Sequence, residues 1–262
     1  MLVFWLVFSF ILGLSAGSFL NCLIWRLSHR KTLLGRSICP KCGHQLFAKD
    51  NIPLLSFLLL RGRCRYCQEK ISFEYPLLEF ITGILFVLVT LKNLGLLPLV
   101  FGWNMGQTFS TDLSPQNIFI LKTIRDWIGV FVLLFIFVYD LKYQIIEDIV
   151  VLPALLVVFL LNIFLGFPWQ RIALGILVGL VFFGSQYLLT KGKGIGLGDL
   201  RIGCFLAAFF AEPWLFLFSL FFGYIIGGAV GLILVVLKRK KWKSAMPLGP
   251  FLVLGAFLVL FT

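Results

Sequence analysis

Charged residues are scarce in this chain of 262 residues: they make up 13% of it, whereas apolar residues make up 60%. The mean hydropathy of +1.03 lies far above the range of soluble globular domains, so that class is excluded. The first residues, MLVFWLVF, lack the basic leading region of a cleavable secretory signal, and the apolar run that they open is longer than the core of such a signal. We therefore expect an integral membrane protein that retains its first apolar segment.

Apolar stretches recur along most of the chain, and a helix needs about 20 such residues to cross a bilayer. We predict an all-α polytopic membrane protein with about eight transmembrane helices, at 2–25, 77–96, 118–139, 149–167, 171–190, 200–212, 214–237 and 246–262. The third carries three charged residues near its start, and the sixth is short for a full crossing. The run 200–237 is too long for one helix, and Pro213 divides it because proline ends helices.

The basic residues are distributed very unevenly among the loops. Of the 23 lysines and arginines, 19 lie in alternate loops, at 26–70, 141–148, 191–201 and 238–243. Under the positive-inside rule these loops are cytoplasmic, so the N-terminus and, after an even number of crossings, the C-terminus lie outside. The net charge of +12 then reflects topology and attraction to anionic lipid headgroups. Nucleic-acid binding is set aside, because the charge is spread over membrane-edge loops without a basic helix or an RNA-binding motif.

One loop, residues 28–74, is long enough to form a small cytoplasmic domain between the first span (1–27) and the remaining seven helices (75–262). It contains CPKC (Cys39, Cys42) and CRYC (Cys64, Cys67), with 21 residues between the two pairs. Two such hooks suit tetrahedral coordination of zinc by thiolates, and disulfides rarely persist in the reducing cytoplasm. A domain this small has little core, so bound metal would contribute much of its folding energy.

The other cysteines and the two histidines carry weaker indications. Cys22 and Cys204 lie within apolar spans, where a cysteine usually acts as a small buried hydrophobe. His44 is an alternative metal ligand, although four thiols suffice without it, and His29 has no assigned role.

Two aspartates stand at the ends of apolar runs that the charge pattern places on the cytoplasmic face. Asp140 ends FVLLFIFVYD, and Asp199 follows the glycine-rich GKGIGLG. A carboxylate near a bilayer centre costs about 2.5–3.5 kcal/mol, so one retained at a span indicates function. Two carboxyls that meet share a proton and act as acid and base on one water, and neighbouring glycines allow close approach of a substrate strand.

Structural roles compete with catalysis at each acidic position. Asp199 also suits an N-cap, whereas Asp140 closes a helix, where a negative charge meets the unfavourable end of the dipole. We expect Glu147 and Asp148 to cap the following helix, and Asp126 and Glu212 to be interfacial on the outer side. Glu79, near the cytoplasmic end of the second span, is expected to line the site or pair with an arginine.

Four stretches of this sequence together resemble the bacterial type IV prepilin peptidases, and the similarity covers essentially the whole chain. The most specific parts are the cysteine block and the glycine-rich element before Asp199. The stretches are GLSAGSFLNCLIWRL (13–27), CPKCGHQLFAKDNIPLLSFLLLRGRCRYCQEKISFEYPLLE (39–79), YDLKYQIIEDIVVLP (139–153) and GKGIGLGDLR (192–201).

The resemblance implies an eight-span inner-membrane aspartic protease of the GxGD type. Such enzymes cut the basic leader from prepilins and from type II secretion pseudopilins, then methylate the new N-terminus with S-adenosylmethionine. The family's catalytic aspartates fall on Asp140 and Asp199, and its cytoplasmic cysteines fall on Cys39, Cys42, Cys64 and Cys67. The chain departs from many relatives at Glu147, where they carry proline, and at Arg201, where lysine is frequent.

Two other classes of function compete with this one. A protease of similar chemistry for another substrate, such as preflagellins or signal-peptide fragments, is less consistent with the long cysteine block. A transporter or a membrane scaffold would use both aspartates as ion-path or capping residues. We find no glycine-rich nucleotide loop after a strand, so the residues that bind S-adenosylmethionine stay unassigned.

Overall fold

The computed structural model describes residues 1–97, 113–192, 194–238 and 246–261. Within these ranges the chain is helical and has no strand, only two isolated bridges, as the all-α prediction requires. Lys193 and residues 239–243, which contributed to the predicted basic loops, and Thr262, at the end of the last predicted span, lie outside the described residues. The chain divides into two compact units, Met1–Leu94 and Gly95–Thr262.

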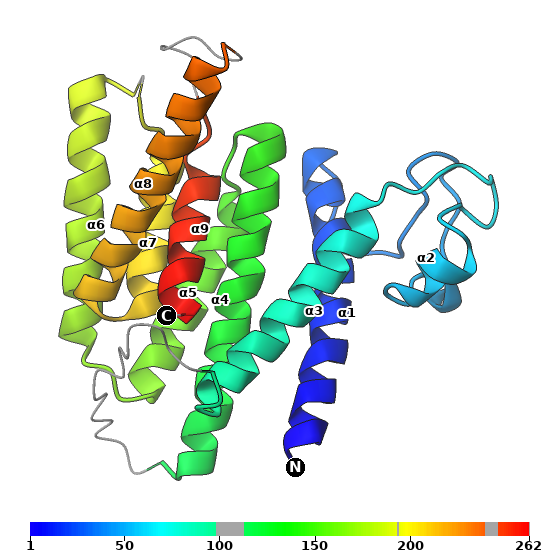
Figure 1. Cartoon of the computed structure of the whole chain (residues 1–262), viewed down its shortest axis with the longest axis horizontal. Coiled ribbons are helices and arrows are strands. Elements are labelled where there is room, and N and C mark those ends of the chain that lie inside the picture. The colour runs from blue at the N-terminus through cyan, green and yellow to red at the C-terminus, as the bar shows by residue number, and fades with distance from the viewer. Residues whose placement is uncertain (98–112, 193, 239–245, 262) are drawn as a thin grey trace. The chain divides into compact units, whose positions relative to one another are not determined.

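The first unit consists of two long antiparallel helices and a small irregular region between them (Figure 1). Helix α1 (Leu2–Ser28) packs along α3 (Glu74–Asn93). A buried hydrogen bond between the hydroxyls of Ser9 and Thr90 (2.8 Å) joins them near one end. Asn21 donates to the carbonyl of Tyr75 (3.0 Å) near the other. The pair is therefore fixed in register along its length.

The irregular region contains η1 (Ala48–Asp50) and the short helix α2 (Leu55–Leu59). Arg26, in the last turn of α1, is buried and donates to four backbone carbonyls, those of Thr32, Leu33, Gly35 and Arg36, at 2.7–3.0 Å. Because a guanidinium has five N–H donors in a fixed fork, this one side chain fixes the path by which the chain leaves α1.

The second unit is a bundle of six helices, shown from green to red in Figure 1. The helices are α4 (Pro115–Tyr143), α5 (Asp148–Phe164), α6 (Trp169–Thr190), α7 (Leu197–Phe210), α8 (Pro213–Val236) and α9 (Gly249–Phe261). Ser114 caps α4, the first of these helices, by accepting the backbone N–H of Asn117. Ala211, in a left-handed conformation, lies between α7 and α8, and α8 begins at Pro213. The break predicted at Pro213 is thus present.

Helix α7 lies at the centre of this bundle, packed against α5, α6, α8 and α9. Residues 202–210 are all buried, so a helix that is short for a bilayer crossing is covered by its neighbours along most of its length. The rings of Phe205 and Phe209 stack at 6.1 Å within it. The helix that carries Asp199 is therefore held on several sides.

Helices occupy all eight predicted positions. Among the described residues, four of them, α1, α3, α6 and α8, are long and apolar enough to cross a membrane by length and composition, and α5 and α9 are shorter apolar helices. Helix α4 carries Lys122, Arg125 and Asp126, as the sequence indicated.

The charges of α4 are arranged differently from the sequence-based expectation. Asp126, expected at the interface, is fully buried, and its Oδ1 accepts from both Nε and Nη2 of Arg125 (2.9 and 2.7 Å). Nη1 of Arg125 donates to Asn162 of α5 (2.8 Å), which donates in turn to the carbonyl of Ala208 in α7 (2.6 Å). This network joins three helices. Glu212 is ion-paired with Arg171 (2.7 Å).

Candidate active site and metal centre

Asp140 occupies the last turn of α4, and its side chain points into the bundle. The residue is 6% exposed, and its Oδ2 accepts the backbone N–H of Gly249 at 3.0 Å. Gly249 is the first residue of α9, whose N-terminus carries unpaired N–H groups and a partial positive charge. The unfavourable position of a carboxylate at the end of α4 is therefore offset by the start of α9.

Asp199 occupies the third position of α7, and its Oδ2 accepts the N–H of Gly196 at 3.0 Å. This bond satisfies one of the free donors at the helix start, so Asp199 takes part in capping, although Gly196 and not Asp199 occupies the N-cap position. A Cβ on the neighbouring Gly198 would meet Cγ1 of Ile146 at 2.8 Å. Only glycine allows the loop after α4 to approach the start of α7 this closely.

The second unit brings the two carboxyls into electrostatic range of each other, so that the charge of Asp199 acts on Asp140. The two residues are 59 positions apart in the sequence, Asp140 in the last turn of α4 and Asp199 in the first turn of α7. Two neighbouring carboxyls do not ionise together readily, and they favour a state with one shared proton. The arrangement is thus suited to acid and base chemistry on one water molecule.

The segment between α4 and α5 is held by two side-chain contacts. Tyr139 donates its hydroxyl hydrogen to Glu147 (2.8 Å), and Arg201 forms an ion pair with Asp148 (2.6 Å). Glu147 stands at the N-cap position of α5, but its side chain makes no capping hydrogen bond, so the expectation of a capping role for Glu147 is wrong. These contacts instead connect this segment to the helices that carry Asp140 and Asp199.

The four predicted cysteines form one cluster in the first unit. The sulfurs of Cys39, Cys42, Cys64 and Cys67 all lie within 4.8 Å of one another, and none of the four is in a disulfide. Zinc at the centre of a thiolate tetrahedron, with Zn–S bonds of about 2.3 Å, separates the sulfurs by about 3.8 Å. Cys39 and Cys67 are 4.0 Å apart, so the donor set fits a zinc ion. His44 is not in the cluster; its ring packs against Tyr66.

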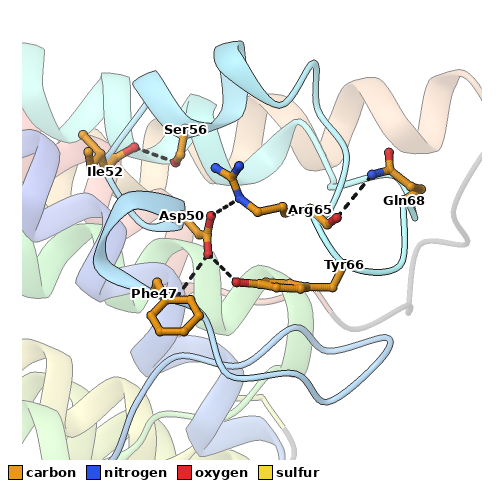
Figure 2. Close-up of polar contacts among 7 residues, drawn as sticks. All are labelled: Phe47, Asp50, Ile52, Ser56, Arg65, Tyr66 and Gln68. Atoms are coloured by element: carbon orange, nitrogen blue, oxygen red, sulfur yellow. Dashed lines mark hydrogen bonds and ion pairs between the residues drawn. The ribbon is translucent and has the colours of Figure 1, made fainter.

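Asp50 connects η1 to the second cysteine pair (Figure 2). Its carboxylate accepts from Nε of Arg65 (2.6 Å), the hydroxyl of Tyr66 (3.1 Å) and the N–H of Phe47 (3.2 Å). Burial alone would raise the pKa of the Asp50 carboxyl, but these hydrogen bonds outweigh it and hold the pKa below its ordinary value. Arg65 and Tyr66 lie between Cys64 and Cys67, so an ionised Asp50 fixes the second cysteine pair relative to η1.

Glu79, of uncertain role in the sequence, lies in the first unit. It is 9% exposed, and its Oε2 accepts the N–H of Leu54 at 2.8 Å. The expected arginine partner is not among its contacts in the described part of the chain. Its carboxylate faces the cysteine-bearing region, at the cytoplasmic end of α3 in the predicted topology.

Sequence reasoning missed Gly249, although it contacts Asp140 more directly than any residue that the patterns indicated. A Cβ at this position would meet Oδ2 of Asp140 at 2.5 Å and Cδ1 of Ile202 at 3.2 Å. The only indication in the sequence was a glycine followed by Pro250 at the start of the last apolar run, a pairing typical of a helix start.

These features define a class: an all-α membrane protein with two carboxyls in electrostatic contact at helix ends and a small region whose four clustered cysteines could hold a metal ion. Residues 11–93 match the family model of the bacterial peptidase A24 N-terminal domain, and residues 127–232 match that of the type IV leader peptidase family. Both aspartates lie in the second match and all four clustered cysteines in the first.

Several curated proteins match almost the full length of this chain. A protein of Aeromonas hydrophila named prepilin leader peptidase/N-methyltransferase is 31% identical, over 98% of this chain and 91% of its own. Proteins of the same name from Aeromonas salmonicida and Pseudomonas putida are 30% and 29% identical, over 98% and 95% of this chain and 91% and 87% of their own. No solved structure matches the chain significantly. The chain belongs to the type IV leader peptidase family.

Proposed function

We propose that the protein removes the basic leader of type IV prepilins and type II secretion pseudopilins and then methylates the new N-terminal amine. The observation that carries this is that the charge of Asp199 acts on the buried carboxyl of Asp140, within the part of the chain that matches the peptidase family model. The relatives' shared name, which pairs peptidase with N-methyltransferase, supports both activities.

In the peptidase step, the ionised carboxyl of the pair takes a proton from the attacking water. The protonated carboxyl donates to the scissile carbonyl oxygen and stabilises the oxyanion that forms on it. The electrons of the water oxygen form the new bond to carbon, and the leaving amine takes up a proton when the peptide bond breaks. Asp140 and Asp199 fill these two roles.

The proposed topology brings the substrate to this pair. With both termini of the enzyme outside, the end of α4 and the start of α7 face the cytoplasmic side of the inner membrane. A prepilin whose apolar helix lies in the bilayer and whose basic leader is cytoplasmic presents its scissile bond at that level. The anionic inner leaflet attracts the leader and the enzyme's basic loops to the same surface.

Zinc has a structural role in this proposal. Held by Cys39, Cys42, Cys64 and Cys67, it stabilises the domain at 28–74, which stands between the helix at 1–27 and the peptidase domain at 75–262. S-adenosylmethionine supplies the electrophilic methyl group when bound. The presence of separate matches for the two parts of the chain is consistent with a division of labour between them.

Substitution of either aspartate tests the peptidase proposal. Asp140→Asn and Asp199→Asn are nearly isosteric, and each leaves an amide that cannot act as a general acid or base near neutral pH. Membranes that contain each variant are incubated with a prepilin, and mass spectrometry of the pilin N-terminus reports cleavage and methylation together. Both variants should insert normally and cleave no leader, whereas Glu74→Gln, at an exposed position, should cleave as the wild type does. Full cleavage by either aspartate variant would refute the proposal that Asp140 and Asp199 catalyse the reaction together.

A further inference from the structure

Helix α2 presents leucines outward rather than toward the interior of the first unit. Leu55, Leu58 and Leu59 are 50%, 69% and 73% exposed, and their spacing of i, i+3 and i+4 places them on one face of the helix, here called the leucine face. Ser56 and Phe57 are half-buried on the other side, toward the interior of the unit. A helix of a water-soluble domain has its apolar face inward, so the leucine face requires a cover.

The exposed apolar surface continues from α2 onto α3. Phe73, at the N-cap position of α3, is exposed, and its ring packs against that of Phe57 at 6.3 Å. Leu77, Phe80 and Ile84 continue the exposed row along α3 at helical spacing. Because α3 is long and apolar enough to cross a membrane, this row suits contact with acyl chains. The ring contact therefore places α2 beside the start of a row suited to lipid.

The depth of α2 follows from one hydrogen bond. The N–H of Leu54, immediately before α2, donates to Oε2 of Glu79 at 2.8 Å. Glu79 is the sixth residue of α3, so it lies about 8 Å along the axis from the start of that helix. The 20 residues of α3 have a length of about 30 Å, which is the thickness of the hydrocarbon core of a bilayer.

The start of α2 is thus held beside a span instead of in the water above it. In Figure 1, α2 lies beside α1 and α3 rather than beyond the ends that the cysteine-bearing region joins. Amphipathic helices that bind a membrane surface bury their apolar face by about 5–10 Å, which is the depth at which the contact with Glu79 holds α2.

Basic side chains flank the leucine face. Lys49 precedes α2, Arg61 and Arg63 follow it, and all three are exposed. Asp50, the only acidic residue between positions 49 and 63, forms an ion pair with Arg65, so its charge is already balanced. Lysines and arginines next to a membrane are attracted to anionic headgroups. An apolar face with basic flanks is the composition of a helix that lies in an anionic interface.

This combination selects the cover of the leucine face. A soluble protein approaches from water, where a surface held at the depth of the acyl chains is out of its reach. The outer part of an anionic leaflet supplies apolar contact at that depth and negative charge just above it. We propose that α2 is an interfacial anchor, with the leucine face inserted among acyl chains and the three flanking basic side chains on phosphates. The anchor goes beyond the proposed function and does not depend on it.

Photolabelling of the unmodified protein tests the anchor. The full-length protein is placed in nanodiscs of phosphatidylcholine and phosphatidylglycerol with a phospholipid that carries a diazirine in its acyl chain. After illumination, trypsin releases residues 50–61, which contain the leucine face, and residues 66–70 of the same loop as separate peptides. Burial of one leucine corresponds to at least about a tenfold change in an equilibrium, so we expect at least about tenfold more label on 50–61. Equal labelling, or labelled α1 and α3 with an unlabelled 50–61, would overturn the proposal.

Photocrosslinking from the leucine face identifies its occupant. Leu58→p-benzoylphenylalanine is illuminated in nanodiscs that contain a prepilin, and its adducts are identified by mass spectrometry. Gln68→p-benzoylphenylalanine, at an exposed position of the peptide 66–70, is the control. We expect phospholipid adducts at position 58 and none at position 68. A crosslink from position 58 to residues 95–262, to a second copy of the chain or to the prepilin, in place of lipid, would overturn the proposal. If the Leu58 variant loses its zinc, the labelling of the wild type decides the question.

Lipid composition tests the basic flanks. Each basic residue near an anionic surface changes membrane association by about fivefold, so replacing phosphatidylglycerol with phosphatidylcholine should reduce the label on the leucine face by at least that factor. The double variant Lys49→Gln and Arg61→Gln should respond less to the same replacement. A wild type that is labelled equally in the two compositions would overturn the role assigned to these basic residues.

Discussion

The backbone N–H of Gly249 donates to Oδ2 of Asp140 at 3.0 Å, although 109 positions separate the two residues in the sequence. The bond joins the last turn of α4 to the first turn of α9. It fixes the orientation of a carboxyl that faces both a water and a substrate in the proposed mechanism, and the helix start favours negative charge on it. Gly249 is a positioning residue in this arrangement, since it acts on the reaction only through Asp140.

Replacing Gly249 with alanine should therefore impair cleavage without unfolding the bundle. The added Cβ would lie 2.5 Å from Oδ2 of Asp140, so the carboxyl must turn away from its present position. A displacement of about 1 Å at a reacting group costs about 100-fold in rate, and we expect kcat for leader cleavage to fall by that factor with little change in KM. Gly228→Ala is the control, because its Cβ would meet nothing within 4 Å. Equal kcat for the two variants would show that the contact does not matter.

Removal of one thiolate should release the metal while leaving the peptidase chemistry intact. Cys39 is buried within the cluster, and Cys39→Ser leaves three thiolates, too few for a closed structural zinc site. Zinc content, measured by elemental analysis of the purified protein, should fall from one ion per chain to none, and residues 28–74 should become sensitive to protease. Cys22→Ser, outside the cluster, should keep its zinc. One zinc ion per chain in Cys39→Ser would contradict the four-thiolate assignment.

Neutralising Asp50 should weaken the metal site from outside the ligand shell. The side chain is 2% exposed and supports Arg65 and Tyr66 between two of the cysteines, so Asp50→Asn loses the charge that holds them. Residues that support metal ligands typically change affinity by about 10–100-fold, and we expect zinc to transfer to a chromogenic chelator at least about tenfold more readily. Lys49→Gln, its exposed neighbour, provides the comparison. If zinc transfers to the chelator equally readily from both variants, Asp50 does not support the metal site.

Asn162→Leu should destabilise the second unit. The substitution leaves a charged N–H of Arg125 and the carbonyl of Ala208 buried without this partner. Hydrogen bonds between membrane helices average only about 0.6 kcal/mol, but bonds to charged groups are worth about 1.5–3 kcal/mol. We therefore expect a loss of about 2 kcal/mol in the free energy of unfolding, measured by denaturant titration in detergent micelles. Asn117→Leu, on the exposed side of α4, should change it by less than about 0.5 kcal/mol.

Local features of the fold followed from the sequence because their causes are local. Apolar run lengths located eight helices, Pro213 marked the break between α7 and α8, and the spacing of two cysteine pairs indicated the metal cluster that the structure assembles. Each depends on the preference of a few neighbouring residues. One short stretch of sequence, such as an apolar run or a proline between two runs, is therefore enough to predict each of these features.

Features that depend on distant partners were not predictable in the same way. From the sequence alone, Asp126 looks like an interfacial charge. Nothing near it indicates that its partner Arg125 donates to Asn162 of α5, which donates in turn to the carbonyl of Ala208 in α7. Glu147 was expected to cap a helix, yet it accepts from Tyr139 on the preceding one. The donor to Asp140 is a backbone N–H, and because almost every residue has one, the sequence does not indicate which residue donates.

The buried network of α4 also bears on how the chain enters a membrane. Arginine and aspartate each cost about 2.5–3.5 kcal/mol at the centre of a lone helix. Asn162, which accepts from Arg125, belongs to α5, and Ala208, which accepts from Asn162, belongs to α7, and ribosomes make both helices after α4. Stable insertion of α4 therefore requires the translocation machinery to retain it until those later segments arrive, so the biogenesis of this unit is cooperative.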